Sequence, residues 1–157
     1  RARIAAAIGA ALTRARSSTR VLMENTAGTK NSLGTTPAEL ALILEMLDGA
    51  PRVGVCIDTA HAFAAGYDWR DDANPLFAEL KRSGLETRVR VLHLNDSKVD
   101  LGKRADRHDH IGLGLIGAVG LGKALRHRLF KGLPVILETP VDDRRGDREN
   151  VASARAL

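Results

Sequence analysis

The sequence predicts an α/β fold built from parallel strand–helix units. Short apolar runs of the kind that form buried strands recur four times along the 157 residues. Segments with helical spacing of leucine and isoleucine lie between them, and capping residues or glycines mark several of their ends. Strands that alternate with helices in this way favour parallel connections with right-handed crossovers.

The first three elements are a helix, a strand and a helix. A helix is expected over residues 2–16, where isoleucine and leucine recur at four-residue spacing among alanines. The apolar run 21–24 ends at an acidic residue and is the first strand. The second helix begins at 36–39, where threonine is suited to the N-cap, proline to the first helical position and glutamate to closing a capping box. Gly49 ends this helix.

The same alternation continues along the rest of the chain. The expected elements are a strand at 53–58, a helix around 76–84, a strand at 89–94, a long polar loop over 95–116, a helix around 121–129, a strand at 133–138 and a further helix that begins near 149.

Two architectures remain open at this point. A complete (β/α)8 barrel typically needs about 250 residues, so the length corresponds to about half of one. A doubly wound open sheet of four or five strands fits the same length. The pattern of strands and helices does not choose between them.

Composition places the chain among ordinary globular proteins. It is 44% apolar and 27% charged, which argues against disorder, and no apolar run reaches the roughly 18 to 20 residues of a membrane span. A single cysteine, Cys56, offers no disulfide framework and favours a reducing compartment, so we expect a cytoplasmic location. The net charge of +5 suits a polyanionic partner, although an arginine-rich coding bias explains it equally well.

Each predicted strand ends in a side chain that can bind a metal. These four residues are Glu24, Asp58, His93 and Glu138. The carboxyl ends of parallel strands form the functional face of α/β folds, so we expect the four side chains to converge there on a divalent metal.

Strand alternation agrees with this arrangement, because side chains two residues apart share a face. If the four ligands point inward, an apolar layer beneath them is made by Leu22, Cys56, Val91 and Ile136. The residues expected to face the helices are Val21, Met23, Val55, Ile57, Leu92, Leu94, Val135 and Leu137.

A second possible ligand set lies close by in the sequence. His61 follows Asp58 by three residues, and Asp106 and His108 lie two apart in the long loop. Two histidines and a carboxylate make a plausible zinc set with open coordination positions. We interpret the other histidines, His110 and His127, as surface-turn residues, and Cys56 as a core residue.

Four motifs, in order, resemble the endonuclease IV family of zinc-dependent apurinic endonucleases. They are Glu24-Asn25-Thr26-Ala27-Gly28, the run from Gly54 to Asp68, His93-Leu94-Asn95-Asp96-Ser97-Lys98 with Asp106-Arg107-His108, and Leu137-Glu138-Thr139. The similarity extends from about residue 20 to 140.

The resemblance implies the C-terminal half of a TIM-type barrel, with residues 1–157 as a single domain of about the last four β/α units. It implies a hydrolase that uses three zinc ions and a metal-activated hydroxide to cut DNA on the 5′ side of an abasic site in base excision repair. Glu24 would bridge the first and second zinc ions. Asp58, His93 and Glu138 would join it on the second, and the third would be held by His61, Asp106 and His108. Glu24 and Glu138 would thereby position the hydroxide.

The resemblance also implies a partner, double-stranded DNA with abasic sites, and a monomer when full length. Two histidines that bind the first zinc in the family, and the loops that enter damaged DNA, come from segments upstream of this sequence. We therefore expect this chain alone to be largely inactive. Departures from the family pattern occur at Lys30, Ala60 and Lys103, and none of these is a ligand.

Two other functions fit parts of the pattern. Sugar isomerases and epimerases of the xylose-isomerase-like barrels use a Glu, Asp, His, Glu quartet on one divalent metal, but do not require His61, Asp106 and His108. A DNA-binding fragment without catalysis is the other alternative. Metal stoichiometry separates the three, because two or more zinc ions suit the nuclease, one manganese or magnesium suits the isomerase, and none suits the binding fragment.

Overall fold

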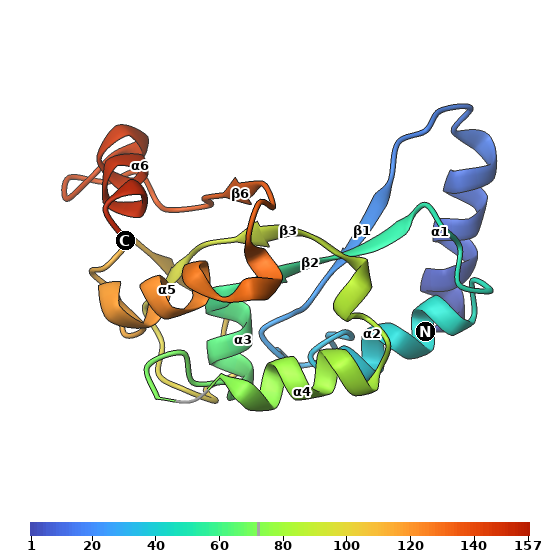
Figure 1. Ribbon diagram of the computed structural model, residues 1–157, viewed down its shortest axis with the longest axis horizontal. Helices are drawn as coiled ribbons and strands as arrows, with labels where there is room; N and C mark the ends of the chain where they lie inside the picture. Colours follow the sequence, from blue (N-terminus) through green and yellow to red (C-terminus); the bar gives the residue numbers. More distant parts are fainter. Residues whose placement is uncertain (72) are drawn as a thin grey trace.

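The computed structural model describes residues 1–71 and 73–157 and has at its centre a four-stranded parallel sheet (Figure 1). The strands are β1 (Val21–Glu24), β2 (Val53–Asp58), β3 (Val89–His93) and β6 (Val135–Ile136), in the spatial order β1-β2-β3-β6. All three pairings are parallel. The predicted class of parallel β/α units is confirmed.

Six helices in the described ranges precede, connect and follow these strands. They are α1 (Ala2–Arg14), α2 (Pro37–Glu45), α3 (Thr59–Ala65), α4 (Asn74–Arg82), α5 (Gly117–Arg126) and α6 (Asp147–Arg155), with short 3-10 turns at Glu86–Arg88 and Arg128–Phe130. Figure 1 shows α2, α3 and α4 along one side of the sheet, with α1 beside β1 at one end and α6 beyond β6 at the other. No helix in the described ranges is long and apolar enough to cross a membrane.

The hydrophobic core lies between the sheet and these helices. Met23, Val55, Ile57, Leu92 and Leu94 are buried in it, as their predicted orientation requires. They pack with helix and turn residues, among them Leu40, Leu76, Leu80, Leu121 and Phe130.

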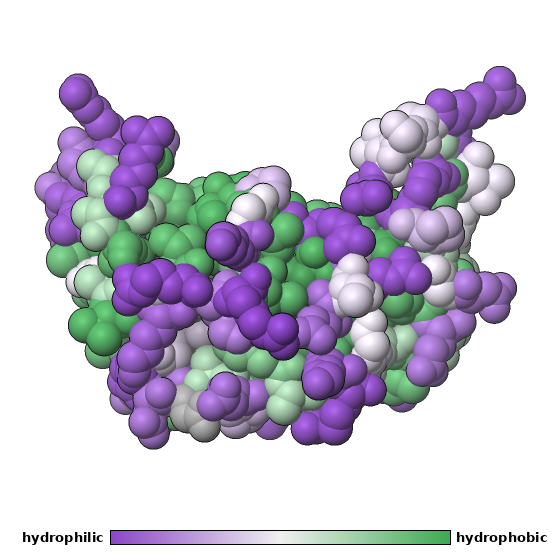
Figure 2. Space-filling view, viewed as in Figure 1, coloured by the Kyte–Doolittle hydropathy of each residue, from purple (hydrophilic) through white to green (hydrophobic). Residues whose placement is uncertain are grey.

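The prediction is weaker at β6, which lies at the edge of the sheet. Val135 was expected to face helices but is 41% exposed, and Ile136 of the inward layer is 46% exposed. Cys56 is buried, whereas Leu22 and Val91 are half-buried. Figure 2 shows apolar surface across the middle of the molecule, between its more polar ends.

Several element boundaries differ from the predicted ones. Strand β6 has two residues instead of six, because its ladder with β3 consists of bonds from the Leu92 and Leu94 amides to the carbonyls of Pro134 and Ile136. The helix predicted around 121–129 ends at Arg126, where the extended backbone of His127 separates it from a 3-10 turn.

Two elements were not predicted. Helix α3 follows β2 directly, capped by Asp58 and ended by Gly66 in the left-handed conformation. The long loop contains a short antiparallel pair, β4 (Asp96–Ser97) and β5 (His108–Asp109). This pair brings His108 back towards the strand that carries His93.

Candidate metal centre

Four of the predicted site residues meet at the carboxyl ends of the strands. Glu24, Asp58 and His93 are the last residues of β1, β2 and β3, and Glu138 follows β6 by two residues. The Nδ1 atom of His93 lies 3.2 Å from Glu24 Oε1, 3.2 Å from Glu138 Oε2 and 3.9 Å from Asp58 Oδ2. One potential ligand atom from each of the four lies within 4.8 Å of the others, which is the spacing that a shared cation requires.

The other three predicted site residues meet beside this quartet. His61 comes from α3, His108 from β5, and Asp106 from the loop just before β5. The Nε2 atom of His61 lies 3.2 Å from Asp106 Oδ2, and the Nε2 atom of His108 lies 3.5 Å from Asp106 Oδ1. Asp58 is shared between the two groups, since its carboxylate also lies within 4.8 Å of ligand nitrogens of His61 and His108.

Hydrogen bonds to the main chain fix both imidazole rings of the second group. The Nδ1 atom of His61 lies 2.9 Å from the carbonyl oxygen of Asn25, and that of His108 lies 3.0 Å from the carbonyl oxygen of Glu138. Donation from Nδ1–H to these carbonyls leaves a lone pair on Nε2, the arrangement typical of histidines that bind metals.

The two Nε2 atoms are buried and have no hydrogen-bond partner among the described residues. Buried polar atoms nearly always have a hydrogen-bond partner or a bound ion, so two such nitrogens beside a carboxylate indicate a missing partner. A divalent cation between His61, His108 and Asp106 would supply it. The donor set therefore fits a metal.

Asp58 forms the buried floor of the centre. Its side chain is completely buried, with Oδ1 accepting the His61 amide at 2.8 Å and Oδ2 accepting the Asn95 side-chain amide at 2.6 Å. Burial raises the pKa of this carboxyl above its usual range, although the imidazoles of His61 and His108 act in the opposite direction. A buried carboxylate of this kind needs a positive partner to remain ionised.

The rim of the centre is open to solvent, and its carboxylates contact histidine rings. The side chains of Asp106 and Glu138 are 54% and 47% exposed. Burial acts to raise the pKa of Glu24, but contacts with the imidazoles of His61 and His93 outweigh it and hold the pKa at about 2. Burial acts to lower the pKa of His61, and the bond to Glu24 with the nearby carboxylates raises it to about 9. Metal binding would thus displace protons from these rings.

The structure corrects the interpretation of two histidines and supports that of the cysteine. His110 is fully buried, with Nε2 at 2.8 Å from Asp142 Oδ1 and Nδ1 accepting from the Asn150 amide at 2.9 Å, so it is not a surface-turn residue. His127 is half-buried and stacks on Phe77 with ring centroids 3.4 Å apart. Cys56 is buried beneath the quartet, as expected of a core residue.

Two asparagines that are not among the predicted site residues connect the residues of the centre. The side chain of Asn25 bonds both the amide and the carbonyl of Asp58, at 2.7 and 3.1 Å. Asn95 contacts the Asp58 carboxylate and also accepts the Glu138 amide, at 2.7 Å. Their position directly after a predicted strand is the one sequence signal that could have indicated them.

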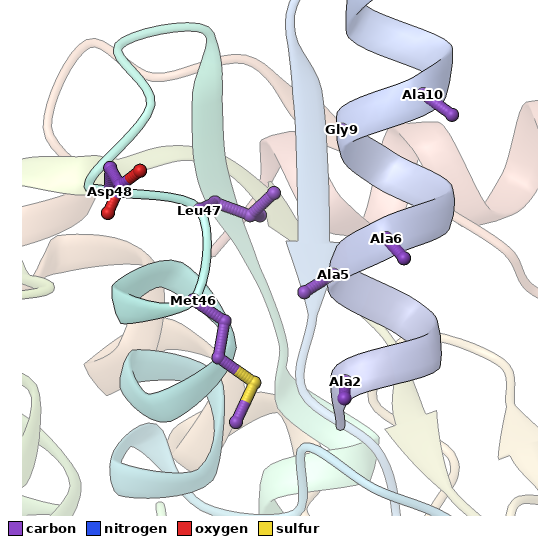
Figure 3. Close-up of a pocket in the computed structure, with 8 residues that line it drawn as sticks. All are labelled: Ala2, Ala5, Ala6, Gly9, Ala10, Met46, Leu47 and Asp48. Carbon is purple, nitrogen blue, oxygen red and sulfur yellow. The ribbon is translucent and has the colours of Figure 1, made fainter.

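A separate pocket lies away from these residues. It has a volume of about 640 Å³ and lies between α1 and the end of α2 (Figure 3). It is lined by Ala2, Ala5, Ala6, Gly9, Ala10, Met46, Leu47 and Asp48. These small and apolar side chains offer one carboxylate and no cluster of catalytic groups.

Comparison with known proteins gives consistent results. Residues 1–157 match the family described as Xylose isomerase-like TIM barrel. The chain is 49% identical over 158 residues to "Probable endonuclease 4" of Methanoculleus marisnigri, which covers 99% of the chain and 56% of that protein. It is 50% identical over 140 residues to "Probable endonuclease 4" of Cenarchaeum symbiosum, which covers 87% and 50%.

A solved structure shows the same arrangement of elements. The crystal structure of endonuclease IV from Thermus thermophilus matches with a TM-score of 0.72 and 39% identity, covering 86% of this chain and 47% of that one. The chain thus spans about half the length of the relatives that it matches.

Proposed function

The chain belongs to the xylose isomerase-like TIM barrel family, and from its similarity to relatives named endonuclease 4 we propose that the protein is a zinc-dependent endonuclease. Its reaction would be hydrolysis of the DNA phosphodiester on the 5′ side of an abasic site, as part of base excision repair. Double-stranded DNA with abasic sites would be its partner, and it would act as a cytoplasmic monomer.

The observation that carries this proposal is the second ligand group. A quartet of Glu, Asp, His and Glu on one metal would also suit a sugar isomerase. An isomerase has no use for two further histidines whose Nε2 atoms are buried, unpaired and beside a carboxylate. Sites with two metal ions are common among nucleases and phosphatases.

The seven candidate ligands form two groups. Glu24, Asp58, His93 and Glu138 would hold one zinc ion, and His61, Asp106 and His108 another. A third ion is expected in the full-length protein, with Glu24 as a shared ligand. When bound, zinc supplies a hydroxide at neutral pH and offsets the negative charge of the phosphate.

The chain's own groups set where this chemistry takes place. The buried carboxylate of Asp58 lies between the two groups and fixes their separation. The exposed carboxylates of Glu138 and Asp106 lie at the solvent side, where a phosphate backbone can approach. Glu24 and Glu138 would be the catalytic carboxylates, as metal ligands that position the hydroxide, and both contact His93.

The first test is metal content by elemental analysis, together with cleavage of a duplex that contains one abasic analogue. We expect two or more zinc ions per chain. One manganese or magnesium ion would indicate the isomerase, and no metal without cleavage would indicate the binding fragment.

Two variants sharpen the test. His61→Ala should lose one zinc ion, whereas the control His127→Ala should keep the full content, because His127 stacks on Phe77 outside the centre. In the full-length protein, Glu138→Gln should lower turnover by orders of magnitude and leave DNA affinity largely unchanged. Near-normal turnover would remove Glu138 from the metal shell.

A further inference from the structure

We propose that Asn95 is a positioning residue of the metal centre, which sets the relative placement of Asp58 and Glu138. This inference rests on the proposed function, because it concerns the same metal ligands. It assigns a role to a residue that donates no ligand itself.

The side chain of Asn95 contacts two ligand residues at once. Its Nδ2 donates to Asp58 Oδ2 at 2.6 Å, and its Oδ1 accepts the main-chain amide of Glu138 at 2.7 Å. Asp58 ends β2 and Glu138 follows β6, and these strands are not neighbours, since β3 lies between them. Asn95 therefore joins residues that the sheet itself does not pair.

The main chain of Asn95 is held in place as well. Its amide donates to Thr59 Oγ1 at 2.9 Å, and its carbonyl accepts from the same hydroxyl at 2.7 Å. Thr59 is the first residue of α3, the helix that carries His61. Asn95 is completely buried, so its side chain has no water to bond instead.

The contact with Glu138 continues the sheet beyond its last ladder bond. The amide of Leu94 donates to the Ile136 carbonyl at 2.9 Å, where β6 ends. Two residues later the amide of Glu138 finds the side-chain oxygen of Asn95 in place of a strand carbonyl. This bond fixes the Glu138 amide, as the bond from His108 Nδ1 fixes the Glu138 carbonyl, and the two together hold the segment that presents the Glu138 carboxylate.

The contact with Asp58 fixes the rotation of a carboxylate. Oδ1 is held by the His61 amide and Oδ2 by Asn95, so the group cannot turn without breaking one of these bonds. Asparagine suits this position because its planar amide offers a donor and an acceptor at once. Aspartate would set an oxygen against Asp58 Oδ2, and an apolar side chain would lose both contacts.

The test compares Asn95→Asp with Asn150→Asp in the full protein. Asn150 is also a completely buried asparagine with side-chain bonds, to His110, Ile111 and Gly146, and it contacts none of the seven candidate ligands. The readouts are zinc affinity by competition with a chelator, the visible spectrum of the cobalt(II)-substituted protein, and thermal unfolding of the metal-free protein.

Residues that orient metal ligands typically change affinity by about 10- to 100-fold when replaced. We expect Asn95→Asp to weaken zinc binding within that range and to alter the cobalt spectrum. Asn150→Asp should destabilise the metal-free fold but leave zinc affinity and the spectrum as in the wild type. If Asn95→Asp does not fold, Asn95→Ala replaces it, because it buries no additional charge, and the same 10- to 100-fold loss is expected.

Two results would overturn the assignment. One is a folded Asn95 variant with wild-type zinc affinity and cobalt spectrum, and the other is an equal loss of affinity in Asn150→Asp. If the wild-type protein binds no zinc, the proposed function itself fails. If the wild-type protein binds zinc and cleaves DNA, and the Asn95 variant has the same zinc affinity and cobalt spectrum, the proposed function stands. Only the positioning role of Asn95 is then wrong.

Discussion

Replacement of Asp96 by asparagine should strongly destabilise the fold. The Asp96 carboxylate is completely buried and organises the glycine-rich segment between β5 and α5. Its Oδ1 accepts the amides of Ser97, Ile116 and Gly117, and its Oδ2 those of Gly112, Gly114 and Gly117, at distances from 2.8 to 3.2 Å. Five main-chain donors thus depend on one side chain.

The magnitude follows from which donors lose their acceptor. Asparagine has the same shape but presents an NH2 group in place of one oxygen. If the NH2 group takes the place of Oδ1, the amides of Ser97 and Ile116 face a donor. If it takes the place of Oδ2, the amides of Gly112 and Gly114 face a donor. Each unsatisfied amide costs about 1–3 kcal/mol, so two cost about 2–6 kcal/mol. That is a large part of the roughly 5–15 kcal/mol that stabilise a domain.

The measurement is urea unfolding followed by circular dichroism, with hydrogen exchange of the Ile116 and Gly117 amides as a local readout. The control is Asp100→Asn, because Asp100 is exposed and, among the described residues, its carboxylate accepts one hydrogen bond, at 3.3 Å from the Leu101 amide. We expect this control to stay within about 0.5 kcal/mol of the wild type. An Asp96→Asn variant equally close to the wild type would refute the reasoning.

Three further predictions concern the fold and its pH dependence. Gly114→Ala should lower the free energy of unfolding, because a Cβ there would lie 2.5 Å from Asp96 Oδ1 and 2.6 Å from the Ser97 carbonyl oxygen. Gly9→Ala in helix α1 has room for a Cβ and should raise the free energy of unfolding by about 0.5–1 kcal/mol. Two variants as stable as the wild type in urea unfolding would contradict both expectations. Thr36→Ala should lower the free energy of unfolding in urea by about 0.5–2 kcal/mol, because the Thr36 hydroxyl accepts the Glu39 amide at the start of α2. An unchanged free energy of unfolding would show that this cap does not stabilise the fold. In the presence of a chelator, thermal stability should fall as pH rises. Burial acts to lower the pKa of His61, but Glu24 and nearby carboxylates raise it from 6.5 to about 9. The stabilisation from protonated His61 is therefore complete below pH 6.5 and is lost as the pH passes about 9. A melting temperature that is constant from pH 6 to 10 would count against it.

The strands and the ends that carry the ligands could be predicted because their signals are local. Apolar runs placed Glu24 and Asp58 at strand ends and His93 one residue before the end of its strand, and the structure has each as the last residue of its strand. Alternation within a strand correctly separated the helix-facing residues from the others on β2 and β3, whereas on β1 it held for Met23 but not for Val21, which is half-buried and outside the core. It failed on β6, where exposure depends on what covers an edge strand and not on its own sequence.

The buried polar network could not be predicted, because it depends on pairs of residues that are distant in the sequence. His110 reads as a loop residue among charged neighbours, yet its partners Asp142 and Asn150 lie 32 and 40 positions further on. Asp96 likewise resembles a solvent-facing residue of a polar loop until its five donors are brought around it. Helix α3 was missed for a different reason, since it is a single short helix whose cap, Asp58, had already been read as a strand end.

The same buried asparagine side chains contact both the strand ends and the candidate metal ligands. A slip of one residue would turn Glu24 or Asp58 towards the helices, because neighbouring strand residues face opposite sides. Asn25 prevents that slip between β1 and β2 by bonding the amide and carbonyl of Asp58. Asn95 links the side chain of Asp58 on β2 to the main chain of Glu138 after β6. Since the ladder hydrogen bonds end at this edge of the sheet, side-chain amides hold the candidate ligands there. If these residues bind a metal, its affinity should respond to loss of the amides even where the rest of the sheet stays folded.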